Sequence, residues 1–228
     1  MAATTSKPLY LITDGGRLRN TGTLVRAVRD ALEGADGAVG FVQLREQNEL
    51  AAREAGISAA SDSELCELAA ELLPYCLKHD AQLIINRRVD LALRTGAHGV
   101  HLGSPVESVD ETRGRYKDQL VLGYSAHSIS EIEAVTRGGI DYLLFSPVFP
   151  PLSKNFPGKT LGLEQLRSGA LRTPKLLFAL GGIQASNAVE CLEAGASGVA
   201  MMSSILLAPE PRVRAKEMAE LTRRHRAD

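Results

Sequence analysis

Short apolar runs alternate with stretches of helical periodicity along the chain. The runs are rich in Leu, Val, Ile and Phe and end at Gly, Asn, Asp or Ser, a pattern typical of buried parallel strands. They cover residues 9–13, 40–44, 81–85, 99–102, 120–122, 141–145 and 176–180 and a segment that starts at 198. Between the first two, Leu24, Val25, Val28 and Leu32 share one face of a predicted helix over residues 21–32. We therefore expect repeated strand–helix units.

Further helices are predicted from apolar spacing and capping residues. They cover residues 62–78, with an expected kink at Pro74, and residues 89–94, 109–116 and 129–137. Two segments have no clear elements. Residues 48–61 are rich in Ala and Glu and are interpreted as a mobile excursion with some helical character, and residues 146–160 form a long loop.

Glycines join predicted helix ends to apolar strands at three places, Gly96, Gly139 and Gly195. Glycine is the expected residue just past a helix, and such short connections suit βαβ units. Eight strand candidates with no linker between them predict a single domain over residues 1–228, folded as a (β/α)8 TIM barrel. A doubly wound open sheet is the alternative, but Asp14-Gly15-Gly16-Arg17 does not supply its glycine fingerprint.

The last two apolar runs end in small residues that suit a phosphate site. Gly181 and Gly182 allow a sharp turn close to a ligand, and Ser203 begins a helix whose first N–H groups are free. The loops after strands seven and eight of such barrels commonly bind phosphate. We therefore predict phosphate binding by Gly181, Gly182, Met202 and Ser203. The alternative is a tight turn followed by an ordinary helix cap.

Composition narrows the choice of partners. A formal net charge of −1 gives no reason to expect nucleic acid or a membrane surface. No apolar run approaches the ~20 residues that span a bilayer, and the first residues lack the apolar core of a signal peptide. Three cysteines without metal-ligand spacing indicate packed thiols in a reducing compartment. We expect a cytoplasmic protein that acts on a small molecule.

Polar side chains stand at the predicted strand ends, which meet at one mouth of a barrel. Gln43 and Arg45 alternate with apolar neighbours and are expected to face the lumen. Arg45 then binds an anion, or forms a structural ion pair with Glu46 or another acidic residue of the barrel. Asn86 could contact a ligand or a neighbouring loop. His101, inside an alternating strand, is more often a hydrogen-bonded core histidine than a catalyst.

Three more residues are candidates for contact with substrate. Ser125 and His127 follow a strand and precede a helix cap, and an imidazole there could carry a proton to and from a ligand. The alternative for His127 is a residue that braces the loop. Lys154 lies in a loop rich in Pro, Ser and Gly that could bring a cation over the mouth, although a solvated lysine is the default.

In this order, the motifs resemble the thiamine phosphate synthase/TenI superfamily from Leu9 to about Leu207. The quoted segments are LYLITD from Leu9, QLRE from Gln43, Ile85-Asn86, GVHLG from Gly99, YSAH from Tyr124, SPVFP from Ser146 with Ser153-Lys154, GGI from Gly181 and VAMMS from Val199. The resemblance implies a (β/α)8 barrel that binds a thiazole ethyl phosphate, an intermediate of thiamine biosynthesis.

The chain departs from the synthase pattern at three positions. Where that pattern has two aspartates that hold Mg²⁺ against a pyrimidine pyrophosphate, this chain has Arg87 and Val106. Gln47 replaces a lysine. Arg and Val offer no hard oxygen ligand, so the resemblance with these changes implies no metal and no cofactor.

The interpretation closest to these residues is a TenI-like thiazole tautomerase, an isomerase that aromatises a carboxythiazole phosphate. In this interpretation His127 is the proton shuttle, Gly182 and Ser203 bind the phosphate, and Lys154 and Arg45 hold the carboxylate or phosphate. One alternative is thiamine phosphate synthase, a transferase that condenses hydroxymethylpyrimidine pyrophosphate with thiazole phosphate. Another is a non-catalytic binder or regulator. The oligomeric state, for which a homodimer is one option, stays open.

Overall fold

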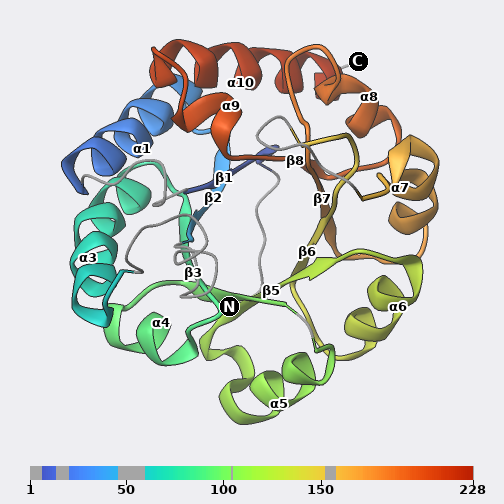
Figure 1. Ribbon diagram of the computed structural model, residues 1–228, viewed down its shortest axis with the longest axis horizontal. Helices are drawn as coiled ribbons and strands as arrows, with labels where there is room; N and C mark the ends of the chain where they lie inside the picture. Colours follow the sequence, from blue (N-terminus) through green and yellow to red (C-terminus); the bar gives the residue numbers. More distant parts are fainter. Residues whose placement is uncertain (1–6, 14–20, 46–59, 104, 152–157, 228) are drawn as a thin grey trace.

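Eight parallel strands close into a barrel in the computed structural model, which describes residues 7–13, 21–45, 60–103, 105–151 and 158–227. Each strand pairs with the next in sequence, and β8 pairs with β1. Figure 1 looks down the barrel, with the strands at the centre and the helices around them. The predicted (β/α)8 TIM barrel is confirmed. The strands are Leu9–Ile12 (β1), Val39–Leu44 (β2), Gln82–Asn86 (β3), Gly99–Leu102 (β4), Val121–Ala126 (β5), Tyr142–Phe145 (β6), Leu176–Leu180 (β7) and Gly198–Met201 (β8).

The helices form the outer ring. They are Thr21–Ala35 (α1), Asp62–Lys78 (α3), Val89–Thr95 (α4), Glu107–Tyr116 (α5), Ile129–Arg137 (α6), Gly162–Ala170 (α7), Ala188–Glu193 (α8), Ser203–Leu206 (α9) and Pro211–Ala227 (α10), with a 3₁₀ turn at Lys117–Gln119 (η1). Helix α3 has the predicted bounds, and its cap is a capping box: the Ser61 side chain accepts from the Glu64 N–H, and the Glu64 carboxylate accepts from the Ser61 N–H.

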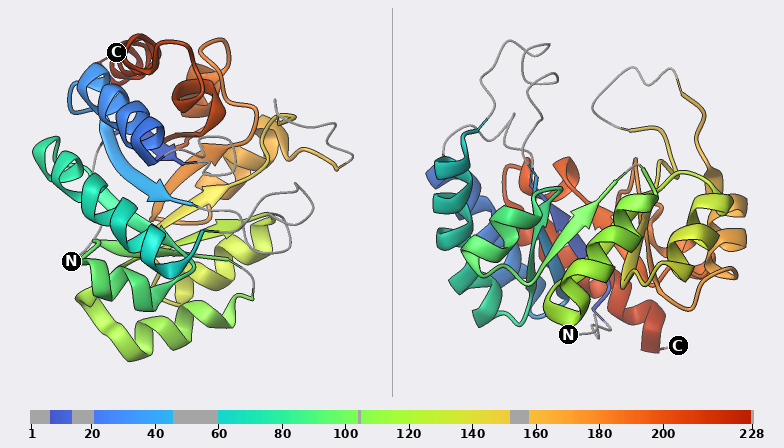
Figure 2. Two further views of the ribbon diagram at one scale, coloured as in Figure 1. Left: turned by 60° about the vertical axis from the view of Figure 1, so that its left-hand side comes forward. Right: turned by 90° about the horizontal axis from the view of Figure 1, so that it is seen from below.

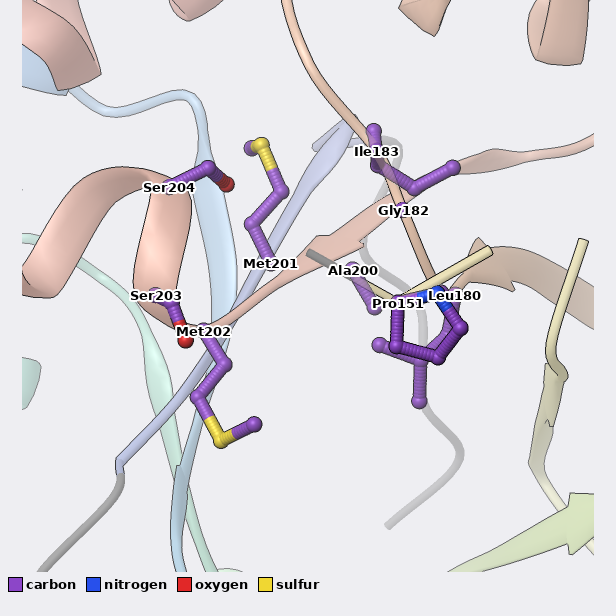
Figure 3. Close-up of a pocket in the computed structure, with 10 residues that line it drawn as sticks. Pro151, Leu180, Gly182, Ile183, Ala200, Met201, Met202, Ser203 and Ser204 are labelled. Carbon is purple, nitrogen blue, oxygen red and sulfur yellow. The ribbon is translucent and has the colours of Figure 1, made fainter. Parts of the chain in front are cut away.

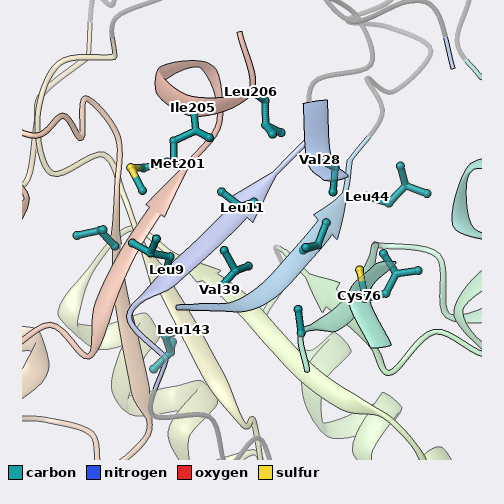
Figure 4. Packing of buried hydrophobic residues seen from close by; sticks show 14 of the residues in the cluster. Leu9, Leu11, Val28, Val39, Leu44, Cys76, Leu143, Met201, Ile205 and Leu206 are labelled. Carbon is teal, nitrogen blue, oxygen red and sulfur yellow. The ribbon is translucent and has the colours of Figure 1, made fainter. Parts of the chain in front are cut away.

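Residues of most strands divide between two separate apolar clusters. On β1, Leu9 and Leu11 pack beneath the helices (Figure 4), whereas Tyr10 and Ile12 belong to the cluster inside the barrel. Aromatic rings dominate the interior: the ring centroids of Phe41 and Tyr142 are 4.7 Å apart. The barrel is therefore a filled core, and a ligand can reach only its end.

All strands run in one direction (Figure 2), so their carboxyl ends meet at one face of the barrel. Two predictions lie outside the described residues: the excursion predicted at 48–61, except for its last two positions, and the loop position of Lys154. Within the part of the chain that the structure describes, no helix is long and apolar enough to cross a membrane.

Candidate functional site

A cavity of about 450 Å³ lies at the carboxyl ends of the strands. This volume is in the range of small-molecule sites. The cavity is lined by most of the residues predicted from the strand ends. They are Gln43, Arg45, Asn86, Ser125, His127, Gly181 and Met202. The structure thus brings these seven side chains or backbone segments to one mouth, as the parallel barrel requires.

Gln43 lies at the floor of this cavity and is 1% exposed. Its Nε2 donates to Asn86 Oδ1 at 2.9 Å, and its Oε1 accepts from the Tyr10 hydroxyl at 3.3 Å. The lumen-facing position predicted for Gln43 is confirmed. The bond joins the neighbouring strands β2 and β3 near their carboxyl ends.

His101 and Tyr142 extend this buried network to the other side of the floor. Tyr142 Oη is 2.9 Å from Tyr10 Oη and 3.2 Å from His101 Nδ1, and His101 Nε2 is 2.8 Å from Ser125 Oγ. Burial, with smaller contributions from Arg45 and Arg87, lowers the pKa of His101 to about 3. His101 is therefore neutral, and it is the hydrogen-bonded core histidine that the sequence indicated.

The donors of this network can be assigned, because each hydroxyl and the neutral imidazole has a single proton to donate. Tyr10 donates to Gln43, so Tyr142 must donate to Tyr10. His101 then donates from Nδ1 to Tyr142 and accepts at Nε2 from Ser125. Each hydrogen bond in this network is therefore donated in the same direction, from Ser125 through to Asn86. Ser125 resembles a nucleophile beside a base, but a pKa of about 3 makes His101 too weak a base to activate it.

Arg45 lies at the rim of the cavity rather than in the lumen. The residue is exposed, and its guanidinium reaches across to the end of β8, with Nη1 3.8 Å from Met202 Sδ. Its backbone is fixed to the end of β1, because its N–H donates to Thr13 Oγ1 at 2.9 Å. The ion pair suggested with Glu46 lies outside the described residues.

His127 is an exposed residue at the edge of the cavity. Its Nδ1 is 2.7 Å from the carbonyl oxygen of Ser146. Because a carbonyl can only accept, Nδ1 carries the proton and Nε2 keeps a lone pair in the neutral ring. The bond ties the end of β5 to the segment after β6, so the loop-bracing role considered for His127 is present in the structure.

A second hollow, of about 80 Å³, adjoins the cavity between the ends of β7 and β8. Figure 3 shows Pro151 and Leu180 on one side and Met202 and Ser203 on the other. Ser203 is the first residue of α9, as predicted, and a helix leaves its first N–H groups without intrahelical acceptors. The hollow and the cavity share Leu180, Gly181, Met202 and Pro151.

Gly181 and Gly182 in this hollow leave room for the segment of residues 147–150 that packs against them. Gly181 and Gly182 have φ of +97° and +64°. A Cβ at Gly181 would lie 2.7 Å from Pro147 Cβ, and one at Gly182 would lie 2.5 Å from the Pro150 carbonyl oxygen. The expected close approach to a ligand is thus accompanied by close packing against residues 147–150.

Arg87 lines the cavity, whereas the sequence analysis treated it only as a change from the synthase pattern. It follows β3, and its guanidinium lies over Gly103 at the end of β4, where a Cβ would be 2.9 Å from Nη2. Val106, the second departure, does not line the cavity; it packs against the apolar core. Within the described residues no group of three His, Cys, Asp or Glu could hold a metal ion. The described lining residues therefore do not fit Mg²⁺.

Comparisons with known proteins agree with one another. The sequence matches the family described as thiamine monophosphate synthase over residues 9–205. It is 36% identical to the thiamine-phosphate synthase of Geobacillus kaustophilus over 202 residues, 87% of this chain and 86% of that one. The thiamine-phosphate synthase of Chlorobium luteolum is also 36% identical, over 84% of this chain and 85% of its own. The solved thiamine phosphate pyrophosphorylase of Pyrococcus furiosus superposes with a TM-score of 0.80 at 30% identity, over 96% of this chain and 97% of that one.

These relatives correct the functional interpretation. The expectation of a thiazole tautomerase is wrong, because the relatives with up to 38% identity across most of the chain bear the name of the synthase, a transferase. The error came from treating the loss of two carboxylates as loss of the reaction. A missing metal ligand does not exclude the chemistry if another cation takes over the charge.

Proposed function

Because the chain belongs to the thiamine monophosphate synthase family, we propose that it is an enzyme of thiamine biosynthesis that forms thiamine phosphate. The reaction condenses hydroxymethylpyrimidine pyrophosphate with a thiazole ethyl phosphate. The nitrogen of the thiazole forms a bond to the methylene carbon of the pyrimidine. The bond from that carbon to the diphosphate oxygen breaks, and the diphosphate leaves with the electron pair.

The observation that supports this function best is the division of the site into two joined spaces. The small hollow at β7 and β8 suits a phosphate group, with Gly181, Gly182, Met202 and Ser203 around it. The cavity of about 450 Å³ beside it has room for two rings. A condensation needs such an arrangement, because both substrates must be held with their reacting atoms in contact.

The polar residues of the cavity take parts that follow from their positions. Gln43, Asn86 and Ser125 form the neutral floor beneath the rings, and Arg45 faces the leaving diphosphate from the rim. His127 forms one wall. Its proton-carrying role belonged to the tautomerase, whereas here the thiazole nitrogen attacks with a lone pair and needs no base. Lys154, which follows β6 in the sequence, is a further candidate cation for the diphosphate.

The test is direct formation of thiamine phosphate by the full-length chain from the two substrates, followed by chromatography and fluorescence after oxidation to thiochrome. We expect product with the phosphorylated thiazole and at least about 100-fold slower formation with the unphosphorylated alcohol, because the hollow then binds nothing. Absence of product with both substrates present, from protein that is folded by circular dichroism, would reject the proposed function.

A further inference from the structure

The rim of the cavity carries two guanidinium groups on neighbouring strand ends. Arg45 follows β2 and Arg87 follows β3. None of the described residues that line the cavity is an aspartate or glutamate. Neither guanidinium has a carboxylate partner among the residues that the structure covers. The rim thus holds two positive charges that nothing described neutralises.

The adjacent arginine shows the contrast. Arg88 is bound by two carboxylates, with Nη1 2.6 Å from Asp62 Oδ1 and Nη2 2.7 Å from Asp90 Oδ2. These bonds tie the start of α4 to α3, and Arg88 does not line the cavity. Of the two consecutive arginines, Arg88 therefore stabilises the packing of α3 and α4, and Arg87 is available to bind a ligand.

The backbone holds Arg87 in an uncommon conformation toward the cavity. Its φ is +62°, a region that side chains other than Asn, Asp and Gly rarely adopt. Its N–H donates to the carbonyl of His101 at 2.8 Å. The guanidinium lies against Gly103, where the missing side chain leaves room for it. Residues kept in such strained conformations gather at functional sites.

We propose that Arg87 binds the diphosphate of the substrate directly, and that diphosphate binding by this chain does not depend on Mg²⁺. The identity of the ligand as an organic diphosphate rests on the proposed function. A guanidinium presents a planar fork of N–H donors that matches two phosphate oxygens, and it keeps its charge at any physiological pH. Arg45, just after the neighbouring strand β2, contacts the same group.

Electrostatics near the floor agree with this placement. Both guanidinium groups help to lower the pKa of His101, so the positive field of the rim extends into the cavity. The same field would stabilise the negative charge that develops on a leaving diphosphate. The carboxylate positions of the resembled pattern offer no competing cation site, because Val106 packs against the apolar core.

The experiment is calorimetric titration of inorganic pyrophosphate into the full-length chain, in EDTA and again with excess Mg²⁺. The variants are Arg87→Gln, Arg87→Lys and the matched control Arg94→Gln, which removes the same charge from an exposed position on α4. We expect wild type to bind in EDTA at least as tightly as with Mg²⁺. We expect Arg87→Gln to lose about tenfold or more in affinity, Arg87→Lys to lose less, and Arg94→Gln to bind as wild type does.

Three results would overturn the proposal: no binding in EDTA, affinity that rises about tenfold or more with Mg²⁺, or wild-type affinity in Arg87→Gln. If Arg87→Gln proves unstable, Arg87→Asn replaces it, since Asn suits a positive φ. The condensation assay separates this inference from the proposed function. Product formation together with Mg²⁺-dependent pyrophosphate binding, or with wild-type affinity in Arg87→Gln, rejects only this inference. Metal-free binding through Arg87 without product rejects only the reaction.

Discussion

The ring of Tyr142 fills the space beside Gly123: a Cβ at Gly123 would lie 2.0 Å from Tyr142 Cζ and 2.2 Å from its hydroxyl oxygen. The two residues are paired across β5 and β6. The missing side chain on one strand therefore allows the neighbouring ring to lie inside the barrel, where its hydroxyl joins Tyr10 to His101. This contact connects the packing of the core to the polar floor of the cavity.

The first prediction concerns that glycine. Gly123→Ala should destabilise the protein by about 1–3 kcal/mol, because the methyl group forces the Tyr142 ring out of position in a packed core. Urea unfolding measures the change. Gly114→Ala on the exposed helix α5 is the control, since a Cβ there meets nothing within 4 Å, and it should not destabilise. Equal stability of Gly123→Ala and wild type would show that the barrel interior can move aside.

The second prediction concerns the hydroxyl of Tyr142. Tyr142→Phe keeps the ring but leaves the His101 Nδ1–H without its acceptor, so we expect a loss of about 1–3 kcal/mol. Equilibrium unfolding in urea gives the value. Tyr116→Phe, on the outer helix α5, should stay within about 0.5 kcal/mol of wild type. A difference of that small size for Tyr142→Phe would mean that the buried network contributes nothing to stability.

The third prediction is a pH dependence. The pKa of His101 falls from its ordinary 6.5 to about 3 in the folded protein. Between these values the unfolded chain binds the proton and the folded chain does not. This contribution to stability is therefore present above about pH 6.5 and is lost as the pH falls toward 3, by about 1.4 kcal/mol per unit.

Unfolding free energies at about pH 7.5 and about pH 5, for wild type and His101→Gln, isolate this contribution. We expect the stability of wild type to fall more steeply on acidification than that of the variant. His79 and His98, whose pKa values are also lowered by burial, remain in both proteins and cancel in the comparison. Parallel pH profiles would contradict the assignment of a neutral His101.

The fourth prediction tests the phosphate hollow. Ser203→Asp should raise the KM for the thiazole phosphate about tenfold or more, because a carboxylate there repels the phosphate. An acidic residue in the first turn suits a helix, so α9 should still form. Steady-state kinetics measure the effect, and Ser168→Asp on the exposed face of α7 is the control. A KM equal to wild type would place the phosphate elsewhere.

The fifth prediction separates stability from binding at Arg87. Arg87→Asn should raise the free energy of unfolding by about 0.5–1 kcal/mol, because Asn tolerates a φ of +62° better than Arg does. Thermal unfolding, compared with wild type, measures this gain. A lower melting temperature would show that the arginine stabilises its own strained backbone.

The sequence predicted elements best where local signals coincide. The helix Ile129–Arg137 has its predicted bounds because Ser128 caps its start and glycine follows its end. Strand β5 was predicted to end at Leu122 but continues to Ala126, since Gly123 resembled a strand end. Only the contact with Tyr142 explains a glycine inside that strand, and such a contact between strands is invisible in one sequence. Helix α10 was not predicted, because most of its residues are polar and its buried positions include only Ala215, Met218, Ala219 and Thr222 among the described side chains.

In the site, too, some features could be predicted from the sequence and others could not. The barrel brings Gln43, Asn86 and Ser125 to one mouth because parallel strands end together, and this followed from the sequence. The direction of long side chains did not follow. Arg45 was expected in the lumen and lies at the rim, and Arg87 was judged by the ligand it could not provide rather than by the anion it could bind.

The one-way hydrogen-bond network of the floor has a consequence for recognition. Ser125 donates its proton to His101, so it can only accept a hydrogen bond from a ligand. The Asn86 oxygen accepts from Gln43, so Asn86 can donate its amide protons to a ligand. A flat heterocycle lying on this floor meets an acceptor at one edge and donors at the other. A ring bound in the reverse orientation would meet the donors and the acceptor at the wrong edges. The uncharged floor can therefore select one orientation of the ring.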